Sequence, residues 1–192
     1  MNKPLLEEDR NGFHLAVYQD MDAESPEAWS NGGVCGWSRH FTVENPRINK
    51  NIFDALIRAD GYDEYSAAAE KLRAEFHVFP IDAYVHSGVV LSLHGEGMSD
   101  RWDTSSHVGC ILVAKREEKL RTRAEKIARG IIATWNQYLA GEVHGFVITK
   151  PSHCDKCGQT SSEEITATWG VYGDTGLAMA AAREASDEIK RP

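Results

Sequence analysis

The sequence predicts an α+β protein in which a mainly antiparallel sheet is packed by a long amphipathic helix and a C-terminal helix. Two observations support this class. Apolar residues recur at three- and four-residue spacing over residues 116–140 and again after Asp174, which is the period of a helix with one buried face. Strand-like segments follow one another directly instead of alternating one by one with helices, and that order is typical of antiparallel sheets.

The N-terminal half is expected to supply most of the strands. Residues 1–12 turn acidic at once, so we expect a flexible lead-in followed by a single domain over residues 13–192. In the segment 13–20, the alternating residues Phe13, Leu15 and Val17 are typical of a half-buried strand. Further strands are predicted at residues 34–43, 77–86, 88–94 and 107–114, with Ser87-Gly88 as a hairpin turn, or as a kink in one strand, between the middle two.

Periodicity predicts helices over residues 50–60, 63–76 and 116–140, and a last helix that begins at Asp174 or Thr175. Two strands, 142–150 and 164–173, stand between the last two helices. The inward stripe of the 116–140 helix is expected to be Leu120, Ala124, Ile127, Ile131, Trp135 and Tyr138, broadened by Ala128, Ile132 and Leu139. That of the C-terminal helix is expected to be Leu177, Ala181, Ala185 and Ile189.

Composition is that of a soluble globular protein, with 42% hydrophobic and 26% charged residues. The formal charge of −8 argues against non-specific binding of nucleic acid, which needs a basic excess. No apolar run approaches the length needed to cross a membrane, and the first residues lack the apolar core of a signal peptide. We therefore expect a cytoplasmic protein with no membrane partner, whose four cysteines are mostly reduced thiols.

Five short motifs follow one another over residues 25–173. They are SPEAWSNGG (25–33), HSG (86–88), WDTSSHVG (102–109), YLAGEVHGF (138–146) and WGVYG (169–173). In this order they resemble the motifs SPxxW-N-G, HSG, WD…VG, YLxGxVxGF and WGFYG of an uncharacterised family of phage and mobile-element proteins. The resemblance implies a phage-type protein that acts in the cytoplasm of a host bacterium, without fixing its chemistry.

Two departures from the family's pattern lie beside these motifs. Val85 stands before HSG where family members usually carry an acidic residue, and the segment between Trp-Asp and Val-Gly is one residue longer. If this loop binds a ligand, both departures are expected to shift its specificity.

A ligand site is predicted where loops 22–33 and 94–107 combine tryptophan, arginine, glycine and polar residues. Aromatic faces, arginine and loop amides together suit a base that carries phosphates. The candidate ligand-binding residues are His86, Ser87, Trp102, Asp103, Trp29, Arg39, Arg101 and His107. Together with the resemblance to a phage family, these residues favour a non-enzymatic counter-defence protein that sequesters a small nucleotide-like immune signal of the host. No cofactor is expected, and the sequence leaves a homo-oligomer open.

A metal site built from His86, His94, His107, Asp100 and Asp103 is a weaker hypothesis. No metal-binding motif fixes the geometry of these residues. On one unbroken strand, His86 and His94 would lie about 26 Å apart, and a hairpin still leaves them at opposite ends of one arm. The sequence therefore favours no metal at this loop.

The pair Cys154 and Cys157 has the spacing that begins a zinc knuckle. A structural zinc site needs four ligands, commonly two such pairs, and a second pair is lacking. Plain thiols at a hairpin tip are favoured, while a partial zinc site and a redox pair stay open as alternatives.

Two other functions stay open. One is a hydrolase or nucleotide-cleaving enzyme that uses His86, Asp103 and His107, although no nucleophile motif accompanies them. The other is a protein–protein module that inhibits a host factor through the outer face of the 116–140 helix.

Overall fold

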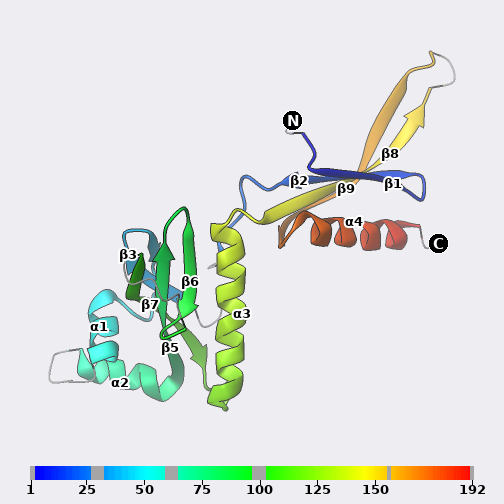
Figure 1. Ribbon diagram of the computed structural model, residues 1–192. Coiled ribbons are helices and arrows are strands. Elements are labelled where there is room, and N and C mark those ends of the chain that lie inside the picture. Colours follow the sequence, from blue (N-terminus) through cyan, green and yellow to red (C-terminus); the bar gives the residue numbers. More distant parts are fainter. Residues whose placement is uncertain (1–2, 27–32, 59–64, 97–102, 155–156, 191–192) are drawn as a thin grey trace. The chain divides into compact units, whose positions relative to one another are not determined.

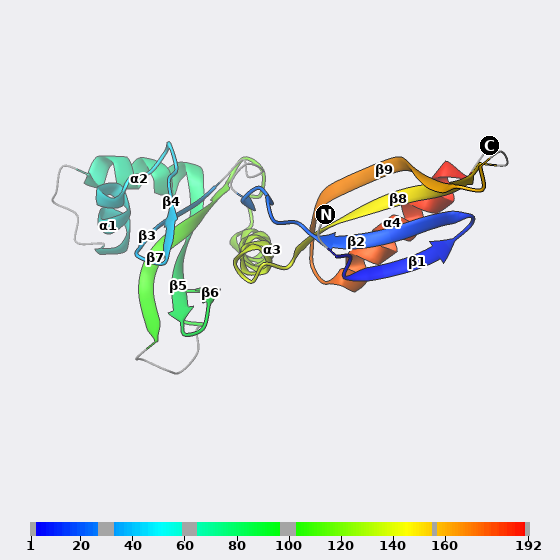
Figure 2. The ribbon, with the colours of Figure 1, turned by 90° about the horizontal axis from the view of Figure 1, so that it is seen from above.

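The computed structural model of the protein describes residues 3–26, 33–58, 65–96, 103–154 and 157–190. The chain forms two compact units where the sequence predicted a single domain. The terminal unit joins Met1–Glu24 with Gly141–Pro192, and the central unit is Ser25–Ala140. Each has its own sheet and its own buried core, which is the physical reason for the division. Figures 1 and 2 show the elements of each unit.

The terminal unit is a four-stranded antiparallel sheet with one helix on one face (Figure 1). Its strands lie in the order β1 (Leu6–Arg10), β2 (Phe13–Gln19), β8 (Val143–His153) and β9 (Thr160–Tyr172). The C-terminal helix α4 (Thr175–Ile189) begins as expected, because the carboxylate of Asp174 accepts a hydrogen bond from the amide of Leu177. The core between sheet and helix is Leu15, Val17, Phe146, Ile148, Ala178, Met179 and Ala182.

Strand β1 corrects the prediction of a flexible lead-in over residues 1–12. Residues Leu6–Arg10 pair with β2 across a tight turn at Asn11-Gly12, where both residues have positive φ. Asn-Gly is the dipeptide that such two-residue hairpin turns prefer, so the signal was present in the sequence. Arg10 then pairs with Asp187 of α4 at 2.9 Å, which ties the strand to the helix.

The central unit is a five-stranded antiparallel sheet covered on both faces. Its strands lie in the order β4 (Phe41–Val43), β3 (Val34–Ser38), β7 (Thr104–Ala114), β5 (Phe76–Val85) and β6 (Val89–Leu93). Helix α3 (Arg121–Leu139) packs on one face, and α1 (Lys50–Arg58) with α2 (Ser66–Glu75) on the other (Figures 1 and 2). Along β7, Ile111 and Val113 join the core under α3, whereas Cys110 and Leu112 join the core under α1 and α2.

Both amphipathic helices are present, but some residues of each predicted inward face are exposed. Helix α3 begins at Arg121 instead of 116, because the side chain of Glu118 accepts from the amide of Leu120 and holds that residue extended. Leu120 and Ile127, predicted to face inward, are 54% and 45% exposed. The buried residues of α3 are Ala124, Ala128, Ile132 and Trp135. In α4, Leu177 and Ile189 are likewise exposed, and Ala178, Met179, Ala182 and Ser186 are buried instead.

The fold class is confirmed, since all strand pairs are antiparallel and a helix closes the chain. The expected hairpin at Ser87-Gly88 is also confirmed, with Val85 opposite Val89 in the β5–β6 pair. Within the described residues, no helix combines the length and the apolar character needed to span a membrane.

Gly109 provides a test of the central sheet. A methyl group at this position would overlap the backbone carbonyl of Cys35 on the neighbouring strand β3, and backbone cannot move aside cheaply. Gly109→Ala is therefore expected to lower the free energy of unfolding by about 1–3 kcal/mol, measured by urea denaturation. The matched control is Gly88→Ala, because a methyl group there meets nothing within 4 Å. Equal effects of the two substitutions would contradict the packing of β3 on β7.

Candidate metal centre

A polar stretch of the central sheet lies beyond the cover of α1 and α2. Along β5, Phe76 and Val78 pack under these helices, and Asp82 follows with the same alternation. The neighbouring residues Ile81 and Ala83 point to the opposite face and join the core under α3. Asp82 thus stands on the face of α1 and α2, at the part of the sheet where charged and polar side chains replace apolar ones.

An irregularity in strand β7 brings His107 to Asp82. In the β5–β7 register, Ile81 pairs with Gly109 and Ala83 with Ser105, so three residues of β7 stand opposite Asp82 alone. Such a bulge bends a strand and redirects its side chains. His107 lies in it with φ of 54°, and its backbone N–H donates to Oδ1 of Asp82 at 2.9 Å.

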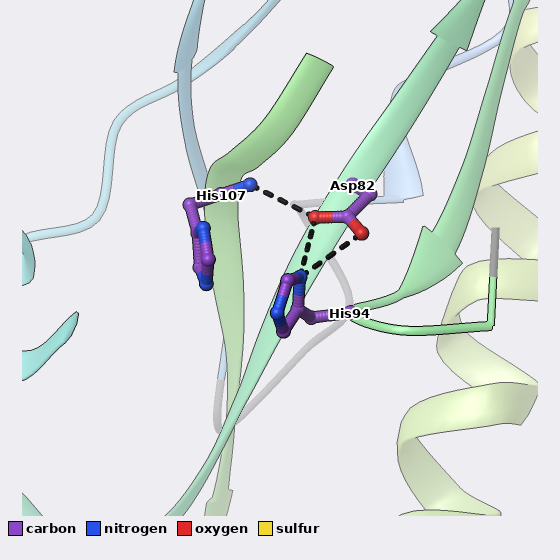
Figure 3. Close-up of side chains that lie close together, drawn as sticks. All are labelled: Asp82, His94 and His107. Atoms are coloured by element: carbon purple, nitrogen blue, oxygen red, sulfur yellow. Dashed lines mark hydrogen bonds and ion pairs between the residues drawn. The ribbon is translucent and has the colours of Figure 1, made fainter. Parts of the chain in front are cut away.

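His94 reaches the same carboxylate from the end of β6. The amide of His94 donates to the carbonyl of Pro80, which continues the β5–β6 pairing by one residue. Its ring Nδ1 lies 3.0 Å from each carboxylate oxygen of Asp82. The rings of His94 and His107 lie side by side, with centroids 3.9 Å apart (Figure 3). Two imidazoles and one carboxylate therefore meet at one point.

The carboxylate of Asp82 is held in its charged form. Only 4% of the residue is exposed, and burial alone would raise the pKa of Asp82. Hydrogen bonds from the His107 amide, the His94 ring and the Gly95 amide outweigh burial and hold that pKa below its ordinary value. A buried anion thus stands beside two imidazole rings that are partly open to solvent.

These three side chains have the composition and spacing of a metal site. One donor atom from each lies within 4.8 Å of the other two. Two donors on one ion lie about 3 Å apart at a right angle and about 4.2 Å apart when opposite, given metal–ligand bonds of about 2.1 Å. The distance of 3.0 Å between His94 Nδ1 and Asp82 already matches the first case. Two histidines and one carboxylate suit a divalent transition metal and leave coordination positions open.

The structure divides the residues that the sequence grouped into one ligand site. His86 and Asp103 meet, with Nδ1 and Oδ2 3.0 Å apart, and the Asp103 carbonyl also accepts from the amide of Val85. His107 contacts Asp82 and His94 instead. The predicted trio of His86, Asp103 and His107 is therefore split between a surface ion pair and the Asp82 cluster.

The other predicted ligand-binding residues have simpler surroundings. Ser87 is exposed in the β5–β6 turn, and Arg39 is exposed in the β3–β4 turn, where its Nε lies 3.2 Å from Nε2 of His40. Trp29, Arg101 and Trp102 lie outside the described residues, as does Asp100 of the metal hypothesis.

Cys154 and Cys157 are exposed at the tip of the hairpin formed by β8 and β9, where the sequence placed them. Among the described residues, neither belongs to a group of three or more metal-ligand side chains. Nothing in this part of the chain completes a zinc knuckle around them.

Asp82 is a candidate metal ligand that the sequence did not place beside the histidines. The sequence set Asp100 and Asp103 next to them, whereas the structure brings Asp82 to His94 and His107 from strand β5. The available signal was an aspartate inside the apolar run FPIDAYV, since a charged residue buried in a strand needs a partner.

No protein-family model, curated protein or solved structure matches the chain. The resemblance to a phage family therefore stays a prediction, and the site is judged on its own geometry.

The depressed pKa of Asp82 predicts how stability depends on pH. A carboxylate with a lowered pKa stabilises the fold above its unfolded pKa of about 3.9, and this contribution is lost as pH falls through the folded pKa. Asp82→Asn is expected to cost about 1–3 kcal/mol at neutral pH, and the difference from wild type should shrink below about pH 4. Calorimetry in the presence of EDTA measures this, with Asp103→Asn as the control. A difference that is constant with pH would contradict the role of the ionised carboxylate.

Proposed function

We propose that the protein binds a small phosphate-bearing ligand through a divalent metal ion held by Asp82, His94 and His107. The observation that carries the proposal is the convergence of one buried carboxylate and two imidazoles, from β5, from the end of β6 and from β7. Three protein ligands hold a metal firmly and leave room for a water molecule or a ligand.

The nucleotide-like ligand that the sequence suggested is compatible with this arrangement. The chain is acidic, with a formal charge of −8, and a phosphate would meet repulsion from most of its surface. A bound divalent cation supplies the positive charge that a phosphate needs and coordinates its oxygens directly. Sequestration of a nucleotide immune signal of the host would then be metal-dependent.

Hydrolysis of the ligand is the alternative reaction at the same site. A divalent ion with an open position can activate water as a nucleophile. His86, Asp103 and His107 do not form one catalytic set, because His107 contacts a different carboxylate from the one that His86 contacts. Binding without cleavage is therefore the function that we place first.

Metal binding is tested on the EDTA-stripped full chain by calorimetric titration with zinc chloride and by cobalt absorption in the visible range. We expect one ion per chain, and Asp82→Asn or His94→Ala should weaken its affinity at least about 100-fold because a direct ligand is lost. The ion also replaces the proton between His94 and Asp82, so affinity should fall at acidic pH.

Two controls separate this centre from other zinc-binding groups. His86→Ala removes an exposed histidine of the same sheet that is not one of the three ligands. Cys154→Ser combined with Cys157→Ser removes the exposed thiols. Both variants should bind zinc as wild type does, and unchanged affinity in Asp82→Asn and His94→Ala would refute the metal centre.

Ligand binding is tested separately with a panel of mono-, di- and cyclic nucleotides, by thermal shift with zinc and with EDTA. We expect a stabilising shift only in the presence of the metal, and none in His94→Ala. Chromatography of the released nucleotide decides between sequestration, which returns it unchanged, and hydrolysis. If zinc binds but no nucleotide shifts the protein, the metal centre stands and the nucleotide ligand is wrong.

A further inference from the structure

The terminal unit carries a separate hollow on the face of its sheet opposite α4. Alternate residues of β2 and β8, such as Val17 and Phe146, are buried under α4, so their neighbours Tyr18 and Gly145 lie on the other face. On that face lies a trough of about 600 Å³. It is lined by His14, Tyr18, Gln19, Val147, Thr149, Ser162, Glu164, Ala167 and Trp169.

Trp169 forms an aromatic wall of this trough. A bulge in the β8–β9 pairing and a positive φ at Gly170 place the indole directly over Gly145, where a Cβ atom would overlap the ring. The ring centroids of Tyr18 and Trp169 are 6.4 Å apart at an angle of 39°, yet the tryptophan stays 51% exposed. A large aromatic face is thus fixed in position and left open to solvent.

The polar groups of the trough are mainly acceptors and negative charges. None of its described lining residues is Lys or Arg, and Glu164 contributes a carboxylate. His14 contacts Asp9 at 2.8 Å and Glu7 at 3.3 Å, so two further carboxylates stand beside it. The side-chain NH₂ group of Gln19 donates hydrogen bonds to the carbonyls of Gly141 and Val143, which leaves the side-chain oxygen as an acceptor.

We propose that this trough binds a small organic cation, a protonated amine or a quaternary ammonium compound. The π-face of an aromatic ring attracts a cation, most strongly for tryptophan, and a nearby carboxylate adds to the attraction. The same charges exclude phosphates and nucleic acid, which need basic partners. The site lies in a different compact unit from Asp82, so this proposal does not depend on the metal centre.

Choline is the probe, and dimethylbutanol, which has the same shape with carbon in place of the charged nitrogen, is its neutral counterpart. Binding is followed in EDTA by NMR of the Trp169 indole N–H, assigned with Trp169→Phe. Choline should shift this signal with saturation, and dimethylbutanol and glucose should bind about two- to thirtyfold more weakly, because they lack the cation–π contact.

The matched pair of variants is Glu164→Gln and Glu163→Gln. Glu164 lines the trough and stands opposite Thr149 in the β8–β9 register. Glu163, the preceding residue of β9, stands opposite Lys150, and its side chain points to the other face of the sheet. Glu164→Gln should weaken choline binding about threefold or more, and Glu163→Gln less than twofold. Both positions are exposed, so neither variant is expected to disturb folding. Equal effects of the two variants, equal binding of dimethylbutanol, preference for glucose, or no shift with choline would each overturn the proposal.

Discussion

The buried carboxylate of Asp82 holds together three stretches of chain that are distant in the sequence. It accepts from the His107 amide on the bulged strand β7, from the His94 ring and from the Gly95 amide beyond β6. Burying an ionised carboxylate costs free energy, and the hydrogen bonds from these donors offset that cost. Both the bulge and the positive φ of His107 depend on that anchor. The geometry of the candidate centre is therefore a consequence of satisfying a single buried charge.

In both units helices cover part of the sheet, and the two proposed sites lie outside the apolar cores that these helices form. In the central unit, Asp82 is not part of the core under α1 and α2, although it is itself buried. In the terminal unit, α4 packs on one side of the sheet and the aromatic trough lies on the other. An antiparallel sheet can leave part of a face in water, so its rigid backbone can position polar and aromatic side chains there.

The two proposed sites select ligands of opposite charge. A cation at Asp82, His94 and His107 would convert a negative point of an acidic protein into an acceptor of anions. The trough beside Trp169 keeps its carboxylates unneutralised by Lys or Arg in its lining and therefore suits cations directly. Because each site lies within one compact unit, each can be tested without reference to the other.

Local pattern was enough to predict most elements of this protein. Alternation identified β2 with Leu15 and Val17 buried, and helical spacing located α3 and α4. The predicted stripes of the helices were partly wrong, since Leu120 and Leu177 are exposed, because a broad apolar face does not reveal which edge of it packs on the sheet. The aromatic trough also went unrecognised, because Trp169 was considered only as part of a motif.

The division into two units and the meeting of Asp82 with His94 and His107 were decided by tertiary structure alone. Spacing along the chain correctly separated His86 from His94, yet it grouped His86 with His107 and could not bring Asp82 in. That encounter requires the register of the β5–β6 hairpin and a bulge in β7, and the bulge is set by the pairing of β7 with β5, which are not adjacent in the sequence. The residue types thus limited the chemistry available, and the strand register selected which of them meet.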